Sequence, residues 1–549
     1  MKKIIIALIC ILAFSACTDD FLNTQNRNSL DVGSFFKTEK DLQLAVNAAY
    51  CPLEFNGMYG VTYFLIFNTL DPYIWFENPK SGYDQLIINP NDFSSTYQAL
   101  YIGLYRTSSV LANIDRLKDV LTAEKYASYK AQITALRAMY YFDLVTWFNA
   151  PIYYDETSLP ANPLIGYKNG TPEQFWNKLE EDLNYAAANL PTVWPSSETG
   201  RITKGAANAL LGKALLFKYY HYYKRFGKEN TAESAANLAK AKAAFENVIN
   251  SKNYKLSTPL NQDKANFMGA LLANFTYLDI PVGSTTYKAE NNSESVWEVQ
   301  YNDDDRANIP WLPGWLSGGQ LLNAYFSPLG YRNHEIDPSL WNEFETTGTP
   351  AGFSRDPRAY ATCYLDGDTI DWRPSSGQNV PFNSAVHTKQ IVLSNGLYSG
   401  AVTYPSKSLG LKKYYYPQWT SKDPLCSPTN VRVIRYADVL LMYAEIKYLI
   451  DADLDGAGLQ ALNDVRARAG MSPVSALTPA SIVHERAVEL ATEGHHYNDI
   501  VRWTFDSRFP NDVNTMFKGN FKLPKNQYFP IPQSEIDANK GALIQNPGW

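Results

Sequence analysis

Cysteine is scarce in this chain of 549 residues, which contains only five. Cys10 and Cys17 stand near the N-terminus, whereas Cys51, Cys363 and Cys426 are spread far apart over the remainder. This spacing excludes a small disulfide-stapled fold and a Cys-x-x-Cys zinc motif. One disulfide among the last three cysteines stays open, and it would leave one thiol unpaired.

Runs of positive charge are also missing. The chain has 49 Lys and Arg against 55 Asp and Glu, which gives a formal net charge of −6. A mildly acidic chain without a basic patch lacks the electrostatic footprint of a nucleic-acid-binding protein. It also lacks the polybasic segment that binds anionic lipid. We therefore predict no nucleic-acid partner.

Catalytic and cofactor signatures are absent as well. The sequence has no Gly-rich phosphate loop, no nucleotide fingerprint and no recognisable Ser-His-Asp motif. Residues 484–490, HERAVEL, begin like the zinc-protease motif H-E-x-x-H, but Val488 stands where the second His belongs. We predict no enzyme activity, no cofactor and no metal. A carboxylate pair for glycoside cleavage stays open, because a sequence does not reveal the separation of two acids.

The acids after this His have a structural interpretation. Glu485, Glu489 and Glu493 are spaced four residues apart, as on one helix face, and Arg486 is near enough to pair with them. His495 and His496 follow Gly494, which fits the C-cap of that helix.

Two acidic stretches match cation sites only in part. Residues 451–456, DADLDG, start like an EF-hand loop, yet Leu462 occupies the twelfth position, where a bidentate Glu is needed. We interpret this stretch as a solvated loop between helices. Residues 302–306, NDDDR, either bind a cation or repel one another in solvent.

The N-terminus has the layout of an export signal. Lys2 and Lys3 precede an uncharged apolar run at 4–14. A helix of that length covers only about half of the roughly 30 Å hydrocarbon core of a bilayer. No apolar run that approaches the roughly 20 residues of a membrane span follows later in the chain.

A cysteine follows this apolar run directly. Residues 14–17, FSAC, resemble a bacterial lipobox, whose last residue is acylated. We predict a signal peptide at 1–16, a lipid on Cys17 and a tether at 17–37. The alternative is an ordinary signal peptide followed by an incidental cysteine.

Helical periodicity dominates most of the chain. In two stretches, apolar side chains recur every three or four positions, as on one face of an amphipathic helix. These faces are Ile133, Leu136, Tyr140, Leu144 and Trp147, and Ala207, Leu210, Leu211, Ala214 and Phe217. A third helix is predicted after Thr171, which suits an N-cap, with Pro172 at the first position and Pro191 at its end.

The predicted helices fall in pairs. The pairs are 95–118 with 123–149, 171–190 with 203–226, and 433–450 with 457–469. Recurrent pairs are typical of tetratricopeptide-like units, and Ala241 with Phe245 carries the A-x-x-x-F element of that repeat. We predict a mainly α-helical fold whose scaffold covers 38–255 and 430–549.

The composition changes at 256–429, where Pro, Gly, Asn and aromatic residues are dense and the helical period is lost. Residues 294–301, ESVWEVQY, alternate and predict a strand, with Trp297 in the core. Long irregular stretches on a regular scaffold commonly carry function. We predict a loop-rich insertion within a single domain at 38–549.

Aromatic residues are abundant, with 38 Tyr and 12 Trp. Aromatic faces in clefts bind flat apolar surfaces, including those of sugar rings. We assign Trp147 and Trp503 to the core with Trp297, but other rings lie in Pro- and Gly-rich loops beside amide and acid side chains. Each of these loop rings is as suited to packing its own loop as to binding a ligand. The candidate ligand-binding residues are Asp71, Tyr73, Trp75, Asn78 and Tyr83 in one loop and Trp311 and Trp315 in another.

Three C-terminal stretches together resemble the SusD/RagB family of surface lipoproteins. They are VIRYADVLLMYAEI (433–446) with ALNDVRARAG (461–470), IVHERAVELATEGHHYNDIVRW (482–503) and YFPIPQSEIDANKGALIQNPGW (528–549). Earlier stretches agree in order, namely the lipobox with DDFLN, then LRAMYYFDLV, TKGAANALLGKALL and RDPRAYA. The chain departs from the family pattern at Ala487 and His496, where Arg is usual, and at Asn498.

The resemblance implies a mostly helical domain with tetratricopeptide-like pairs that support a loop-rich half. It implies a lipid-anchored, non-catalytic protein on the outer face of the outer membrane, over a SusC-like TonB-dependent transporter. Such proteins bind nutrients, commonly glycans and sometimes peptides, and their ligand-contacting aromatics come from the two loops named above. The acids after Cys17 resemble the signal that sends such lipoproteins to the cell surface. Glycan capture, peptide capture and surface glycoside hydrolysis remain the competing functions.

Overall fold

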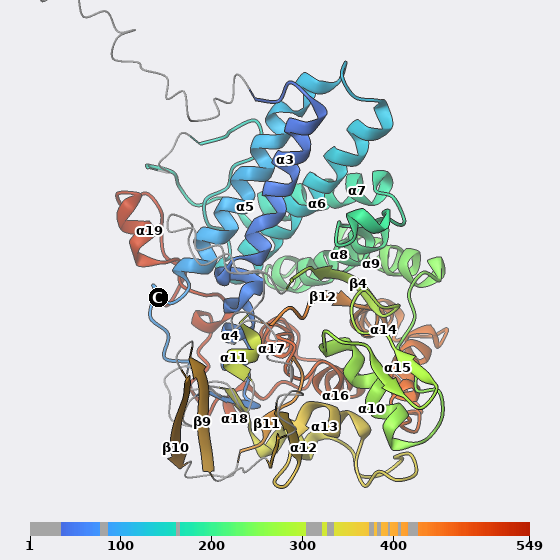
Figure 1. The fold of residues 1–549 in the computed structure, drawn as a ribbon. Coiled ribbons are helices and arrows are strands. Elements are labelled where there is room, and N and C mark those ends of the chain that lie inside the picture. Colours follow the sequence, from blue (N-terminus) through green and yellow to red (C-terminus); the bar gives the residue numbers. More distant parts are fainter. Residues whose placement is uncertain are drawn as a thin grey trace, which may run out of the picture.

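Helices make up most of the molecule, as the periodicity predicts (Figure 1). The computed structural model describes residues 35–76, 86–160, 165–302, 321–326, 334–372, 378–381, 386–393, 396–403, 408–414 and 427–549. No helix in these ranges is long and apolar enough to cross a membrane.

The helices form an upper and a lower tier in Figure 1. The upper tier contains α3 (Glu39–Tyr50), α5 (Ser94–Asn113), α6 (Ala123–Phe148), α7 (Pro172–Asn189), α8 (Lys204–Lys218) and α9 (Ala232–Ser251). The short α4 (Thr62–Thr69) leads down to a lower tier of α14 (Tyr436–Asp451), α15 (Ala457–Arg468), α16 (Pro479–Glu489) and α17 (His496–Trp503). The C-terminal helices are α18 (Val513–Met516) and α19 (Gln533–Ala538).

The predicted helix pairs are confirmed. In each pair the two helices pack on each other, α5 with α6, α7 with α8, and α14 with α15. Thr171 and Gln174 form a capping box at the start of α7, and Pro172 occupies its first position. Helix α8 continues into a π-helical turn over Tyr219–Lys224, which brings its end close to the predicted one.

The two predicted apolar faces are buried, and they belong to one large hydrophobic cluster that also takes in the lower tier. Leu136 and Tyr140 on α6 are fully covered, and Leu211 on α8 is 7% exposed. Helix α6 is buried on nearly all sides from Ala131 onward. The core is therefore shared by sequence segments that lie hundreds of positions apart.

The described parts of the 256–429 stretch contain most of the strands and four short α-helices. The helices are α10 (Lys264–Leu272), α11 (Leu322–Phe326), α12 (Pro338–Glu343) and α13 (Pro357–Thr362). The strands are β2 (Ile280–Val282), β3 (Thr285–Tyr287), β4 (Ser295–Val299), β5 (His334–Ile336), β6 (Cys363–Tyr364), β7 (Thr369–Trp372), β8 (Gln378–Pro381), β9 (Val386–Leu393), β10 (Gly396–Thr403) and β11 (Gly410–Leu411). With β1 (Ile74–Phe76) and β12 (Val431–Arg435), they form antiparallel pairs, namely β1–β5, β2–β3, β4–β12, β6–β11, β7–β8 and β9–β10.

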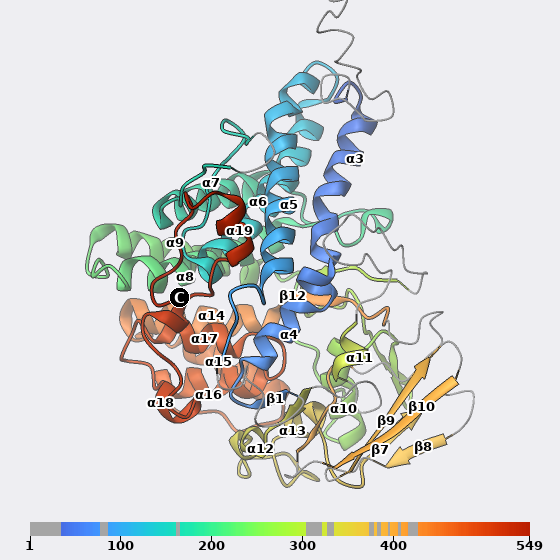
Figure 2. The same cartoon turned by 90° about the vertical axis from the view of Figure 1, so that its left-hand side faces the viewer.

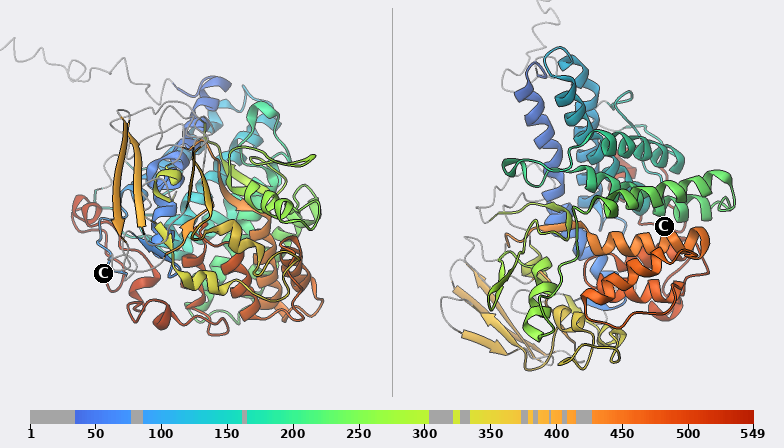
Figure 3. Two further views of the ribbon diagram at one scale, coloured as in Figure 1. Left: turned by 60° about the horizontal axis from the view of Figure 1, so that its bottom comes forward. Right: turned by 90° about the vertical axis from the view of Figure 1, so that its right-hand side faces the viewer.

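Two of these pairs lie in different parts of the molecule. The pair β9–β10 stands at the lower edge of the molecule, on the side away from α9 (Figures 2 and 3). The pair β4–β12 crosses the middle, between the two tiers of helices (Figure 1). The strand predicted at 294–301 is thus confirmed as β4, with Trp297 buried. The alternation of its sequence does not produce an exposed face, because both faces of this central strand are covered.

Candidate functional site

The first candidate loop begins as a turn that is held against α17. Asp71 is buried, and its Oδ1 accepts hydrogen bonds from the backbone N–H of Tyr73 and from Nδ1 of His496, each at 2.9 Å. The ring of Tyr73 stacks on the His496 imidazole, with centroids 4.9 Å apart and planes inclined by 3°. Asp71 therefore turns its carboxylate inward, whereas the sequence suggested an acid that faces a ligand.

Charge stabilises this contact. Burial alone would lower the pKa of His496, but the Asp71 carboxylate outweighs that effect and raises it. The hydroxyl of Tyr73 forms a hydrogen bond with Glu343 on α12. Burial, the charge of Glu343 and this hydrogen bond raise the pKa of Tyr73. Asp71 and Tyr73 thus position the start of the loop against α12 and α17.

Trp75 is presented by a short strand after this turn. Strand β1 pairs with β5, and Trp75 lies opposite Glu335 in that register. The Asp337 backbone N–H donates to the Tyr73 carbonyl at 2.8 Å, which extends the contact between the two segments. Side chains alternate along a strand. Ile74 is accordingly buried, while Trp75 is half-buried.

The other site predictions lie outside the described residues. They are Cys17 at the N-terminus, Asn78 and Tyr83 in the first loop, and Trp311 and Trp315 in the second. Of the acidic stretch at 302–306, only Asn302 is described. Cys51 and Cys363 are free thiols, and Cys426 is also outside the described ranges.

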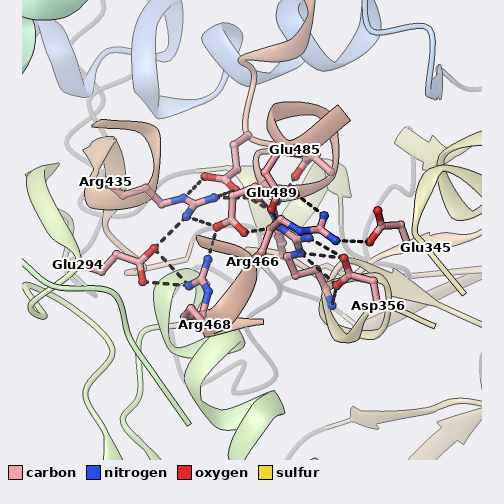
Figure 4. Close-up of polar contacts among 12 residues, drawn as sticks. Glu294, Glu345, Asp356, Arg435, Arg466, Arg468, Glu485 and Glu489 are labelled. Atoms are coloured by element: carbon pink, nitrogen blue, oxygen red, sulfur yellow. Dashed lines mark hydrogen bonds and ion pairs between the residues drawn. The ribbon is translucent and has the colours of Figure 1, made fainter. Parts of the chain in front are cut away.

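The C-terminal motifs assemble a buried ionic network instead of an open site (Figure 4). Glu489 on α16 stands at its centre, between Arg435 and Arg468 (Figure 4). Burial disfavours its charge, but Arg468, Arg435 and Arg358 hold the pKa of the Glu489 carboxyl well below its usual range. Further pairs are Arg435–Glu294 at 2.9 Å, Arg468–Glu294 at 3.0 Å, Arg466–Glu485 at 3.0 Å, Arg466–Glu345 at 2.7 Å and Arg358–Asp356 at 2.6 Å.

The helix that contains His484 differs from its prediction in two details. Helix α16 ends at Glu489, so Glu493 lies in the following turn, where it pairs with Arg435 and Lys413. Gly494 does not cap α16. It has a positive φ of 76° just before α17, and an added Cβ would lie 3.0 Å from the Tyr63 ring.

Arg486 does not pair with the neighbouring acids of its own helix, Glu485 and Glu489. Successive residues of a helix point in different directions, about 100° apart at 3.6 residues per turn. Arg486 therefore faces away from Glu485 and pairs with Asp438 at 2.9 Å and Asp499 at 2.7 Å. The assignment of the cluster as structural agrees with these contacts, but the partner predicted for Arg486 was wrong.

In the acidic loop at 451–456, the carboxylates of Asp453 and Asp455 bind other groups of the protein. Asp453 accepts the backbone N–H groups of Gly458 and Leu459, at the start of α15, and Asp455 pairs with Lys447 at 2.9 Å. Across the described ranges, no three His, Cys, Asp or Glu side chains gather as a potential metal site.

Two family profiles match the chain. The profile of the SusD family matches residues 293–549, and a profile described as starch-binding associating with outer membrane matches residues 20–216. The chain belongs to the SusD/RagB family.

Relatives of this SusD/RagB protein cover nearly its whole length. A SusD-like protein of Formosa agariphila is 22% identical over 98% of this chain and 97% of its own. A SusD-like protein of Bacteroides ovatus is 23% identical over 94% of this chain and 86% of its own.

Solved structures share the fold. A laminarin binding SusD-like protein has a TM-score of 0.68 at 22% identity, with 93% of this chain and 100% of that chain covered. Surface glycan-binding protein A from Bacteroides thetaiotaomicron, in complex with laminarihexaose, has a TM-score of 0.66 at 21% identity, with the same coverage.

Within this SusD/RagB chain, His496 was missed as a residue of the candidate site. The sequence contained a sign of its importance, because His496 replaces the Arg that usually follows EGH in the family pattern. Either an Arg or a protonated His at this position pairs with Asp71, which would otherwise be a buried unpaired acid. What the sequence did not reveal is that the two positions touch.

Proposed function

We propose that this protein is a cell-surface lipoprotein that captures glycans and delivers them to a SusC-like TonB-dependent transporter of the outer membrane. Family membership supports this function. Solved relatives of the same fold are described as laminarin-binding and surface glycan-binding proteins. The description of the N-terminal profile supports association with the outer membrane.

The observation that carries the proposal is the presentation of Trp75. Its strand is paired on one side, and the preceding turn is fixed by the contact between Asp71 and His496, so the half-buried ring is held in place before any ligand arrives. A pre-positioned ring loses little entropy on binding, which favours stacking on a sugar. Tyr73, Asn78, Tyr83, Trp311 and Trp315 complete the proposed ligand surface, with Asp71 as a positioning residue.

In this proposal the protein binds its glycan and does not catalyse a reaction on it. The motif that begins like a zinc protease, at 484–490, places Glu485 and Glu489 in the buried network, where arginines occupy their oxygens. Such acids are unsuited to proton transfer to a substrate, since they are buried and already paired. The lipid on Cys17 is the proposed membrane anchor.

Peptide capture is the second candidate, because some members of the family bind peptides. Affinity electrophoresis of the full-length protein through a panel of polysaccharides, beside binding of peptide pools, separates the two. We expect retardation by at least one polysaccharide and no saturable peptide binding. Peptide binding alone would reverse the assignment, and release of reducing ends from a retarding glycan would identify a hydrolase.

A further inference from the structure

A pocket is lined by residues from the C-terminal end of α3, the turn that follows it, β4 and the loop before α8. Its volume is about 330 Å³. Ligand pockets span about 300–1,000 Å³, so this one suits a small ligand or one segment of a longer one. The lining residues that matter are Asn47, Tyr50, Glu54, Glu198, Arg201 and Trp297.

Arg201 holds one wall of this pocket in place. Its guanidinium donates to Asn47 Oδ1 at 2.8 Å and to Gln132 Oε1 at 3.0 Å, and its Nε pairs with Glu198. The guanidinium carbon lies 5.9 Å from the centre of the Tyr50 ring. Since all three guanidinium nitrogens are engaged, the wall keeps its shape without a ligand.

Trp297 closes the pocket on the β4 side. The residue is 4% exposed, and its indole Nε1 donates to the Gly200 carbonyl at 3.0 Å. An added Cβ at Gly200 would lie 2.3 Å from Cγ of Gln300, so the loop packs directly on the strand. The pocket is thus part of the folded framework.

Glu54 is the exception in this ordered lining. No side chain or backbone group in the described parts of the chain donates a hydrogen bond to it or forms an ion pair with it. Burial raises the pKa of its carboxyl to about 7. The side chain is half-buried, and a carboxyl that loses part of its hydration without gaining a partner costs stability. Its oxygens remain free as hydrogen-bond acceptors within the pocket.

We propose that this pocket binds one or two rings of an oligosaccharide, whose hydroxyl groups donate to Glu54. The inference rests on the proposed function and adds to it a second glycan-binding site, distinct from Trp75. A neutral ligand fits the charges, since Arg201 neutralises Glu198 and the buried Glu298 is bonded to Asn430 and Arg432. Asn47, ordered by Arg201, adds amide hydrogens as donors.

A divalent cation fits less well. Calcium takes about six to eight oxygen ligands, including several carboxylates. Among the acids that line this pocket, Glu54 alone has no partner in the described parts of the chain, and those parts contain no cluster of three acidic, His or Cys side chains that could hold a metal ion.

The test uses the full-length protein and the glycan that retards it, as a series of oligosaccharides. At pH 8.5, where a carboxyl with a pKa of about 7 is ionised, Glu54→Gln keeps the shape of the side chain and removes its charge, and should weaken binding about tenfold, as expected for a charge-assisted hydrogen bond. Ser197→Trp, at an exposed position on the pocket wall, should block the pocket and weaken binding at least as much. Glu124→Gln, an exposed acid on α6, is the matched control and should leave affinity unchanged.

A chemical reporter locates the ligand. Cys51 is a partly exposed free thiol that lines this pocket, whereas Cys363 is buried and serves as the internal reference. Saturating oligosaccharide should protect Cys51 from iodoacetamide, as measured by mass spectrometry, and Glu54→Gln should reduce that protection at equal ligand concentration. Thr199→Cys places a second thiol at an exposed position of the same lining, in case Cys51 reacts too slowly.

Each outcome decides between the two proposals. Unchanged affinity in Glu54→Gln, or unprotected thiols at saturation, overturns this pocket and leaves glycan capture at Trp75 standing. Protection by calcium chloride instead of saccharide also overturns it. A wild-type protein that binds no glycan in the panel overturns the proposed function and this pocket together.

Discussion

His496 and Asp71 form a buried ion pair across 425 positions of the chain, with Nδ1 and Oδ1 2.9 Å apart. Through this contact, the turn before β1 and the start of α17 become one structural unit. The proposed ligand loop therefore depends on the C-terminal motif for its position. It also acquires an imidazole whose pKa the Asp71 carboxylate raises above the ordinary His value.

Removal of this pair should destabilise the protein. His496→Ala leaves the Asp71 carboxylate buried without its partner, and we expect a loss of about 2–4 kcal/mol in the free energy of unfolding. His496→Arg keeps a cation at the position where Arg is usual in the family, and should retain most of the stability. Urea unfolding at pH 6 measures both variants, and His484→Gln, at a half-buried imidazole without this contact, is the control. Equal stability of His496→Ala and wild type would contradict the assigned role.

The same pair predicts a pH dependence. Because the pKa of His496 is raised in the folded state, the pair contributes fully below the ordinary His pKa of about 6.5. That contribution is lost as the pH rises through the folded pKa. The stability of wild type should therefore fall relative to His496→Arg as the pH rises above about 6.5, the ordinary His pKa, and a difference that is independent of pH would argue against an ion pair.

The buried ionic network around Glu489 should contribute less to stability at acidic pH. Glu489→Gln leaves Arg435 and Arg468 without their central partner, and should cost about 3–5 kcal/mol of stability. The pKa of Glu489 is lowered on folding, so its contribution is present above the ordinary Glu value of about 4.3 and is lost as the pH falls below it. Thermal unfolding at pH 7 and pH 3.5 should show the difference between wild type and variant shrinking in acid. Glu233→Gln, an exposed acid on α9, should show no difference at either pH.

The two loop tryptophans should affect affinity more than stability. Loss of one stacked ring costs about 1–3 kcal/mol of binding, which weakens affinity roughly ten- to hundredfold for Trp75→Ala or Trp311→Ala. Melting temperature and glycan affinity are measured on the same samples. Phe226→Ala removes an exposed ring elsewhere and is the matched control. Lost stability with unchanged affinity would make these rings packing residues of their loops.

The anchor is tested by fractionation. Cys17→Ala removes the only proposed lipid site and should release the protein from the membrane or leave it unprocessed, since stable anchoring takes at least two acyl chains. A conservative control, Cys51→Ala, removes a thiol that carries no proposed lipid. Membrane attachment of Cys17→Ala that survives washing would show that another element holds the protein.

Local chemistry was enough to predict the helix pairs, their caps at Thr171 and Pro172, and the burial of Trp147, Trp297 and Trp503. These features depend on residues a few positions apart, so the sequence by itself determined them. It also sufficed to interpret the acids of α16 as structural, because the second zinc ligand is missing at Val488.

Tertiary structure alone decided where the polar groups point. Asp71 faces inward because His496 lies beside it, Arg486 pairs with Asp438 and Asp499 instead of its neighbours, and Glu54 lies in a pocket where no described residue pairs with it. A charged side chain is accommodated by whatever lies within a few ångströms in space, and its neighbours in the chain do not determine that. The energy of a buried charge depends on those distant partners, which is why the core could be predicted from periodicity and the polar contacts could not.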